Sequence, residues 1–348
     1  MAQNKVQYQQ GLSIPEFFDD YGSPEQCEAL VRSWRWPNGF VCPRCPGSWH
    51  SEFRRQQRLY FQCSACRYQC SLVSGTIFES STLALPTWFL AMHLMTQAKN
   101  NVWALELKRH LGVSYPTAWL LKHKIMEVML LREESRQLTG RVEIDDAYLG
   151  GEVRGGKAGR GSPNKVPFVA AVQTTESGQP VLMCLSQRPF TKESIQAFAQ
   201  KSLAAPATVV SDGLGCFTAV QGTGILHEPH VTGGGAASVK HPSFLAVNTV
   251  LGNIKTSLSG TYHAFGFRKY GHRYLAQVQY LFNRRFNLRA VLERLARAAS
   301  QVKPCGLRAI RAAELHCCSG ARKQKGHRCG WPFRSSQSEP HLAWGETM

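Results

Sequence analysis

The sequence contains no aspartate or glutamate between Pro229 and Leu292, although this stretch carries eight lysine and arginine residues. Acidic residues are scarce in the whole chain, with 23 Asp and Glu against 41 Lys and Arg, which gives a formal net charge of +18. This balance favours a polyanionic partner, either nucleic acid or an anionic membrane surface. A ribosomal-type or merely basic protein would share the same charge balance.

Long apolar runs are also absent. The most apolar stretch, residues 85–95, contains Pro86 and His93 and is too short to span a bilayer. Residues 1–10 are polar and do not have the apolar centre of a secretory signal. We therefore expect a cytoplasmic, nucleoid-associated protein that contacts DNA and no membrane. Twelve cysteines in that compartment indicate metal binding rather than disulfides.

A chain of 348 residues with 43% hydrophobic and 18% charged residues has room for two or three globular domains. Helices are expected over 24–34, 86–98, 102–111, 114–131, 191–203, 246–258 and 268–302, and strands over 141–148, 166–175, 180–186 and 207–211. The pattern predicts an α+β multidomain protein with an N-terminal helical segment (1–35), a zinc ribbon (36–75), a helical segment (76–135), an α/β core (136–316) and a poorly ordered tail (317–348).

Two Cys-x-x-Cys pairs form the most specific motif of the chain. Cys42 and Cys45 are followed, after 17 residues, by Cys63 and Cys66, which is the spacing of a four-thiolate zinc site. One tight turn in each pair can place both sulfurs on a tetrahedral ion. Four thiolates leave no open coordination position, so a bound Zn²⁺ would be structural. The alternative is a set of buried free cysteines; Cys70 and His50 are possible substitute ligands, but neither is needed.

Residues 104–119 have the form of a helix, a turn with a glycine and a second helix. Ser114 would cap the second helix and expose Tyr115 and Thr117 at its start, where a helix-turn-helix unit reaches base edges. Lys122 and Lys124 are expected to contact phosphates. The alternative is an ordinary helical hairpin with a solvated basic face.

Two aspartates lie in strand-like settings upstream of the acid-free stretch, Asp145 in Arg-Val-Glu-Ile-Asp-Asp and Asp212 after an apolar run. Paired aspartates on strands are typical of a two-metal site for phosphodiester chemistry, although an Asp at a strand end is more often a turn former. Asn248 and Lys255 are about two helical turns apart and share a face. The order β-β-β-α-β-α fits a ribonuclease-H-like core in which Asp145, Asp212 and Asn248 could converge.

Residues 151–158 nearly match a phosphate-binding loop. The position after Lys157 lacks the Ser or Thr that would hold magnesium, and the flanks read as strands, so we reject nucleotide hydrolysis. Arg154, Lys157 and Arg160 in this glycine-rich segment are better suited to a flexible loop on the DNA backbone. A plain solvated loop is the alternative.

Several short stretches in a fixed order carry a family resemblance. They are residues 35–43 (Arg-Trp-Pro-Asn-Gly-Phe-Val-Cys-Pro), 74–78 (Ser-Gly-Thr-Ile-Phe), 142–145 (Val-Glu-Ile-Asp), 248–250 (Asn-Thr-Val), 260–263 (Gly-Thr-Tyr-His) and 282–286 (Phe-Asn-Arg-Arg-Phe). With them the chain resembles bacterial insertion-sequence transposases that have an N-terminal zinc ribbon and a DDE-type core, in the group in which Asn and Lys complete the motif. The resemblance extends from about Trp34 to Asn287.

The resemblance implies that Asp145 and Asp212 bind Mg²⁺ or Mn²⁺, and it places Asn248 where relatives carry glutamate, with Lys255 seven residues on. It also implies a metal-dependent transposase, at least dimeric, that cleaves double-stranded DNA at the terminal inverted repeats of its element and joins it to target DNA.

The amide at Asn248 leaves the chemistry open. A neutral carbonyl oxygen gives the site a charge of −2 rather than −3, so metal should bind more weakly. Lys255 could pair with a DNA phosphate or with charge that develops in the transition state. Alternatively, Asn248 contacts DNA and no third ligand is needed. A zinc-ribbon regulator with an inactive core and a decayed element copy are the rival functions, and we interpret residues 229–292 as a DNA-facing basic region.

Overall fold

The computed structural model describes residues 10–98, 100–151, 162, 164–231, 241–262 and 265–312. The predicted tail, 317–348, lies outside this range, as do Arg154, Lys157 and Arg160 of the glycine-rich segment. Among the residues it describes, no helix is long and apolar enough to cross a membrane.

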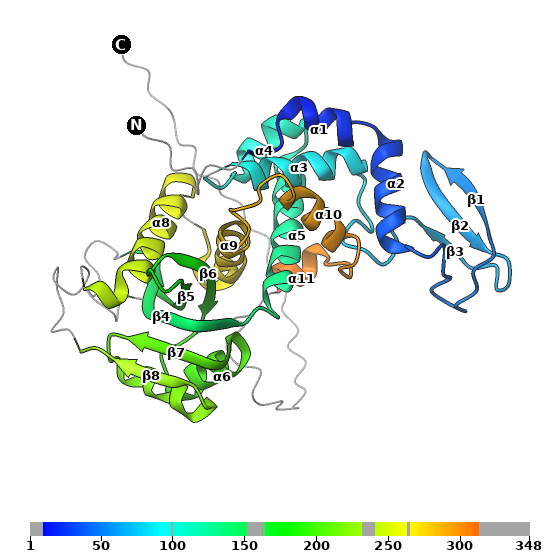
Figure 1. The fold of residues 1–348 in the computed structure, drawn as a ribbon. Helices are drawn as coiled ribbons and strands as arrows, with labels where there is room; N and C mark the ends of the chain where they lie inside the picture. The colour runs from blue at the N-terminus through cyan, green and yellow to red at the C-terminus, as the bar shows by residue number, and fades with distance from the viewer. Residues whose placement is uncertain are drawn as a thin grey trace, which may run out of the picture. The chain divides into compact units, whose positions relative to one another are not determined.

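Two short helices begin the described chain, α1 (Ile14–Tyr21) and α2 (Pro24–Arg35), as Figure 1 shows. Sequence reasoning predicted α2 but missed α1. α1 begins with a capping box, in which the Ser13 hydroxyl accepts the N–H of Glu16 and the Glu16 carboxylate accepts the N–H of Ser13. The Ser-x-x-Glu pattern was therefore a readable signal for this helix.

The cysteine pairs flank a small antiparallel sheet. Its strands are β1 (His50–Arg55), β2 (Arg58–Cys63) and β3 (Gln69–Ser71), in the order β1-β2-β3. Phe61 of β2 is fully buried between Phe40, whose ring centroid is 5.4 Å away, and Trp36, at 4.7 Å. These aromatic rings pack beside the thiolates and belong to the same large core as the helices that follow.

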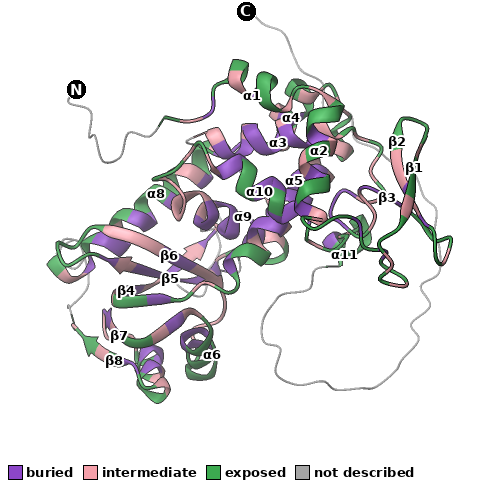
Figure 2. Ribbon diagram, turned by 45° about the vertical axis from the view of Figure 1, so that its right-hand side comes forward, coloured by how far each residue is buried: buried purple, intermediate pink, exposed green. Residues whose placement is uncertain are grey.

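Three helices follow: α3 (Leu85–Gln97), α4 (Ala104–Leu111) and α5 (Tyr115–Glu133). Gly112 ends α4 in the left-handed region, with φ of 63°, and the Ser114 hydroxyl accepts the N–H of Thr117 at the start of α5. The helix, glycine turn and capped helix agree with the predicted arrangement. Figure 2 shows that α5 is buried along much of its length.

A five-stranded mixed sheet forms the core of the second half. Its strands are β4 (Leu138–Leu149), β5 (Val166–Thr174), β6 (Pro180–Gln187), β7 (Leu203–Ser211) and β8 (Leu226–Pro229). The order is β6-β5-β4-β7-β8; β5 is antiparallel to both β4 and β6, β7 is parallel to β4, and β8 is parallel to β7. This order and these directions confirm the ribonuclease-H-like core, with β8 as a strand that the sequence did not reveal.

Helices cover both faces of this sheet (Figure 1). α6 (Lys192–Ser202) and the 3₁₀ helix η2 (Gly215–Thr223) pack against the face that carries Ile144. α8 (Leu245–Thr261) packs against the opposite face, which carries Leu149. Because side chains alternate along a strand, every second residue of β4 points toward α8.

The last described helices are α9 (Phe267–Phe282), α10 (Val291–Ala299) and α11 (Leu307–Arg311). The prediction of one long helical region over 268–302 was wrong, because the chain turns between α9 and α10. The Asn283 side chain accepts the N–H of Met183 at 2.8 Å and donates to its carbonyl at 3.0 Å. Asn283 thereby hydrogen-bonds both backbone groups of Met183 in the edge strand β6, at the point where α9 ends.

Several arginines of the acid-free stretch have partners inside the protein. The ion pairs are Arg273–Glu127 (2.7 Å), Arg284–Glu133 (2.5 Å) and Arg289–Glu16 (2.7 Å), and Arg285 donates to the carbonyl of Val181 (2.9 Å). The interpretation of residues 229–292 as a DNA-facing region is therefore wrong for these four side chains. Their acceptors come from distant parts of the chain.

Glu133 is the most heavily bonded of these acids. It is 5% exposed at the end of α5, and its carboxylate also accepts from Arg136 (2.9 Å) and Asn283 (2.7 Å). Burial opposes ionisation, but Arg284 and Arg136 outweigh it and hold the pKa of Glu133 below its ordinary value. The carboxylate thus joins α5, α9 and the edge strand β6.

Replacing Arg284 by alanine should lower the free energy of unfolding by about 3 kcal/mol, because Glu133 would stay buried with one cation fewer. Arg294→Ala, at an exposed position of α10, should change it by less than about 0.5 kcal/mol. Chemical denaturation of both variants measures the difference. Equal stability of the two would show that the Glu133 junction contributes little.

Candidate functional site

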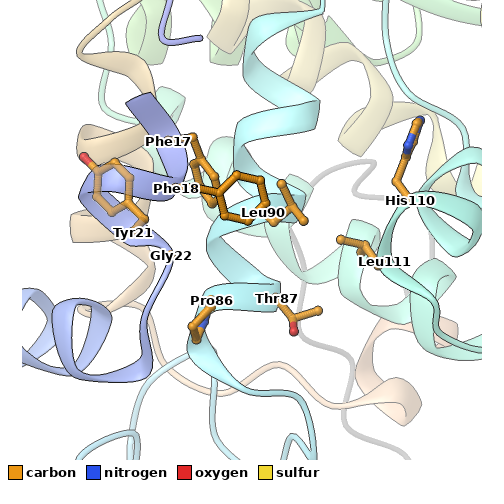
Figure 3. Close-up of a pocket in the computed structure, with 9 residues that line it drawn as sticks. All are labelled: Phe17, Phe18, Tyr21, Gly22, Pro86, Thr87, Leu90, His110 and Leu111. Atoms are coloured by element: carbon orange, nitrogen blue, oxygen red, sulfur yellow. The ribbon is translucent and has the colours of Figure 1, made fainter. Parts of the chain in front are cut away.

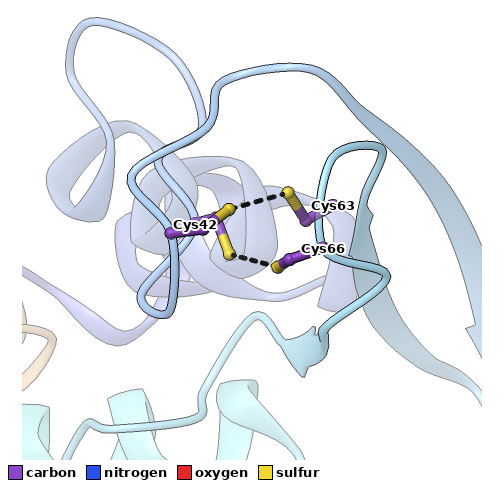
Figure 4. Close-up of side chains that lie close together, drawn as sticks. Cys42, Cys63 and Cys66 are labelled. Atoms are coloured by element: carbon purple, nitrogen blue, oxygen red, sulfur yellow. Dashed lines mark hydrogen bonds between the residues drawn. The ribbon is translucent and has the colours of Figure 1, made fainter.

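The four cysteines of the two Cys-x-x-Cys pairs converge. Their sulfurs all lie within 4.8 Å of one another, with Cys42 Sγ 3.6 Å from Cys66 Sγ and Cys45 Sγ 3.5 Å from Cys63 Sγ. Figure 4 shows the side chains of Cys42, Cys63 and Cys66 pointing toward a common centre. Four sulfurs at about 2.3 Å from a tetrahedral zinc ion would lie about 3.8 Å apart, so the donor set fits Zn²⁺.

The surrounding turns favour thiolates. The N–H of Arg44 donates to Cys42 Sγ at 3.4 Å. The backbone N–H of Cys66 outweighs burial and lowers the pKa of the Cys63 thiol to about 6. Cys70 is buried outside the cluster, and His50 bonds to the Ser48 carbonyl and to Glu52. Neither possible substitute ligand belongs to the cluster.

A second cluster consists of carboxylates. The parallel ladder between β4 and β7 ends where Ile144 pairs with Ser211. Asp212 follows the last residue of β7, and Asp145 is the next residue of β4, which continues to Leu149 paired with β5. One carboxylate oxygen from each of Asp145, Asp146 and Asp212 lies within 4.8 Å of the others, and all three residues are half-buried. Asp145 and Asp212 are thus brought together as the sequence analysis expected.

Asp146 is the member of this cluster that sequence reasoning missed. Strand alternation assigns it to the opposite face of β4 from Asp145, and only Asp145 of the pair was predicted to be a site residue. Its backbone N–H donates to Asp145 Oδ1 at 2.8 Å. The adjacent pair Asp145-Asp146 was visible in the sequence, and only its position at the end of the β4–β7 ladder shows that both charges meet Asp212.

The electrostatics of the cluster oppose full ionisation. Burial, then the charges of Asp146 and Asp212, raise the pKa of Asp145 to about 7, although the N–H of Asp146 and the charge of Lys255 lower it. Carboxylate oxygens crowded in this way suit a hard divalent cation, which would remove their mutual repulsion. The residues present therefore fit a divalent metal.

The Asp212 carboxylate also bonds to the backbone of the turn that follows β7. Its Oδ1 accepts the N–H of Leu214 at 3.0 Å, and Gly213 between them has a φ of 81°. The turn-forming alternative is therefore also true of this residue: one oxygen closes the turn after β7. The same turn holds the carboxylate at the end of the strand, beside Asp145.

The residues Asn248 and Lys255 both lie on α8, which covers the Asp145 face of the sheet. Asn248 is half-buried and Lys255 is exposed. The ammonium group of Lys255 is close enough to Asp145 to act on its charge. The predicted constellation thus draws on two strands and one helix.

The helix-turn-helix residues divide into two groups. Tyr115 is 45% exposed and Thr117 half-buried at the start of α5, where the prediction needs them. The prediction that Lys122 and Lys124 contact phosphates is contradicted, since they are 1% and 6% exposed. Lys122 Nζ donates to the Val102 carbonyl at 2.6 Å and to the Tyr262 hydroxyl at 2.5 Å, and Lys124 Nζ donates to the Ile77 carbonyl at 3.2 Å.

A shallow cavity of about 150 Å³ lies between α1, α3 and α4 (Figure 3). Its lining is mainly apolar and includes Phe17, Phe18, Leu90 and Leu111, with His110 at its rim. None of these residues belongs to the thiolate or carboxylate cluster. The cavity therefore takes no part in either metal site.

Comparisons with known proteins fall on these two sites. Residues 137–283 match the family model described as the ISXO2-like transposase domain, and residues 22–69 match the transposase zinc-ribbon domain. The first range contains the carboxylate cluster and α8, and the second contains all four clustered cysteines.

A relative from Halobacterium salinarum, described as an uncharacterized protein in transposable element ISH50, is 30% identical over 136 residues. The aligned part is 38% of this chain and 44% of the relative, so less than half of the relative's length is spanned. A solved structure, the Mos1 transposase paired-end complex with left transposon end, gives a TM-score of 0.21 at 13% identity, over 57% of this chain and 75% of that chain. That similarity is too low to carry an argument.

Replacing Cys63 by serine should abolish zinc binding, because three thiolates and an alcohol replace the four-thiolate set. Cys70→Ser is the matched control, since Cys70 is equally buried but lies outside the cluster. Elemental analysis of purified protein should find about one zinc ion per chain in the wild type and in Cys70→Ser, and none in Cys63→Ser. If Cys63→Ser retained zinc, the assignment of a four-thiolate zinc site would be wrong.

Binding of Mn²⁺ to the carboxylate cluster should weaken as pH falls below about 7, by up to about tenfold per pH unit. The reason is that the cation must displace the proton of Asp145, whereas an aspartate with an ordinary pKa would give a flat profile over this range. Asp146→Asn removes one neighbouring charge and should move the onset to lower pH. Titrations followed by the electron paramagnetic resonance of free Mn²⁺ measure both profiles.

Two results would contradict these roles of Asp145 and Asp146. A flat profile in the wild type would mean that Asp145 does not bind the ion. Weaker binding by Asp146→Asn at pH 8.5, where Asp145 is ionised, would make Asp146 a ligand rather than a neighbour.

Proposed function

We propose that the chain is a DNA transposase of an insertion sequence, because residues 22–69 match the transposase zinc-ribbon domain and residues 137–283 match the ISXO2-like transposase domain. It binds the ends of its element and catalyses metal-dependent DNA cleavage and strand transfer. The observation that carries the proposal is the meeting of Asp145 and Asp212 at the end of the parallel β4–β7 ladder, within the matched transposase domain.

Asp145 and Asp212 are the proposed ligands of Mg²⁺ or Mn²⁺. A divalent ion bound there would supply Lewis acidity, which lowers the pKa of water or of a 3′-hydroxyl and neutralises charge on the phosphate. The protein's own contribution is to hold the two carboxylates at the end of the β4–β7 ladder, where the ladder and the Asp212 turn fix their directions. The raised pKa of Asp145 makes it a ligand that releases a proton when the ion binds.

Asn248 and Lys255 complete the proposed site from α8. Asn248 offers a carbonyl oxygen to the ion, and Lys255 pairs with a DNA phosphate or with charge that develops on it during cleavage. Lys255 is suited to this role because it is exposed and its charge already reaches Asp145. The amide adds no negative charge, so the negative charge of the proposed ligands comes from Asp145 and Asp212, with Asp146 beside them.

DNA binding is assigned to the N-terminal half. The zinc ribbon (36–75) and the helical segment (76–135) hold the element ends, with Tyr115 and Thr117 at base edges. The glycine-rich segment with Arg154, Lys157 and Arg160 binds the backbone of target or element DNA. Pairing of two ends requires at least a dimer, and such a protein works on the chromosome, in the bacterial cytoplasm.

Asp145→Ala and Asp212→Ala should each reduce Mg²⁺-dependent strand transfer by at least about 10³-fold, because each removes one of the two proposed carboxylate ligands of the ion. Binding to end DNA should remain, since both aspartates lie outside the ribbon and α5. Glu176→Ala, which removes an exposed carboxylate after β5, is the control and should keep full activity. Strand-transfer assays on duplexes with the element's terminal repeats, beside mobility-shift assays, give both readouts.

Activity retained in both aspartate variants would refute the assignment. End binding by the wild type without cleavage at any concentration of Mg²⁺ or Mn²⁺ would instead favour a zinc-ribbon regulator or a decayed copy.

A further inference from the structure

The first turn of α8 needs hydrogen-bond acceptors from elsewhere. The first N–H groups of any helix have no partner within the helix. The residue before α8, Phe244, has no side chain that can cap them, and the first turn contains no acidic residue. Because the chain has no Asp or Glu between Pro229 and Leu292, a carboxylate must come from a distant part of the sequence.

Glu143 of β4 supplies that carboxylate. Its Oε2 accepts the N–H of Val247 at 2.9 Å, and the N–H of Ala246 interacts with the same group. The side chain is 2% exposed. Burial raises the pKa of Glu143 above its ordinary value, although the two N–H groups at the helix N-terminus and the charge of Arg141 act to lower it.

Arg141 strengthens the same contact. Its guanidinium lies 3.6 Å from Glu143 Oε1 and donates to the carbonyl of Ser243 at 3.2 Å. Ser243 belongs to the 3₁₀ helix η3 (Pro242–Phe244), which leads directly into α8. Arg141 and Glu143 thus hold both the approach to α8 and its first turn.

Strand geometry connects this contact to the carboxylate cluster. Arg141, Glu143 and Asp145 are alternate residues of β4, so all three face α8. Asn248 follows directly after Val247, whose N–H the Glu143 carboxylate binds. Lys255 lies about 10 Å beyond Asn248 along the helix axis and acts on the charge of Asp145. One row of side chains therefore sets where α8 begins and which of its residues meet Asp145.

We propose that Glu143 is a positioning residue for the carboxylate site: by capping α8 from β4, it holds Asn248 and Lys255 in register with Asp145. This inference rests on the proposed function. Glu143 touches neither metal nor DNA. Its contribution is to the place and direction of α8, and a displacement of about 1 Å at such a site can cost about 10²-fold in rate.

The test compares Glu143→Ala and Glu143→Gln with Glu133→Ala in the full-length protein. Glu133 is the matched control, because it is another buried glutamate of the same unit with bonded partners, and it lies away from α8. Two quantities are measured: hydrogen exchange of the Ala246 and Val247 amides, and the Mg²⁺ concentration that gives half-maximal cleavage of end DNA.

Glu143→Ala should expose both amides to faster exchange and raise the half-maximal Mg²⁺ concentration by about 10-fold to 100-fold. Glu143→Gln keeps one oxygen acceptor without the charge, so it should fall between Glu143→Ala and the wild type; it also serves if Glu143→Ala does not fold. Glu133→Ala should lower the unfolding midpoint but leave the Mg²⁺ requirement and the two amides unchanged.

Unchanged exchange at Ala246 and Val247 in both Glu143 variants would overturn the cap. Faster exchange with an unchanged Mg²⁺ requirement and rate would overturn the positioning role. If Glu133→Ala raised the half-maximal Mg²⁺ concentration equally, the effect of Glu143 would be one of overall stability and its positioning role would be refuted. If the wild type cleaves no end DNA with any divalent ion, the proposed function fails and the positioning role falls with it, while amide exchange still decides the cap.

Discussion

The parallel pairing of β4 with β7 is the constraint on which the carboxylate site depends. Backbone hydrogen bonds of the ladder pair Ile144 with Ser211, and Asp145 and Asp212 follow at the ends of that ladder. The sheet therefore brings the two carboxylates together in spite of their repulsion. Burial, then the charges of Asp146 and Asp212, raise the pKa of Asp145 to about 7. Because the ladder is buried between two layers of helices, this repulsion is not relieved by strand separation, and a divalent cation is the partner that would relieve it.

The stretch without acidic residues acquires its anionic partners from elsewhere in the chain. Glu143 caps α8, while Glu127 and Glu133 of α5 pair with Arg273 and Arg284. The Glu127 and Glu133 ion pairs connect α5 to α9 and to the turn that follows it, and the Glu143 contact connects β4 to α8.

Local patterns in the sequence predicted much of the fold. Alternating apolar residues predicted β4 to β7, the glycine and the capping serine predicted the turn between α4 and α5, and the cysteine spacing predicted the thiolate cluster. The failures have one cause, which is that the deciding contacts are distant in sequence. At the end of α9, the Asn283 side chain is hydrogen-bonded to Met183 of β6. Lys122 is buried, and its ammonium group donates hydrogen bonds to the Val102 carbonyl and the Tyr262 hydroxyl. Asp146 was not predicted as a site residue. Strand alternation gives the face on which a side chain starts, but it does not show that the carboxylates of Asp145, Asp146 and Asp212 lie within 4.8 Å of one another at the end of the ladder.

Anomalous diffraction from a crystal of the full-length protein with Mn²⁺ and end DNA would show whether β4, β7 and α8 together form one metal site. We predict a manganese peak bound by Asp145 and Asp212 on the α8 face of the sheet, with the carbonyl oxygen of Asn248 within about 2.5 Å. A peak held without either aspartate, or Asn248 turned away from an ion that both aspartates bind, would contradict it.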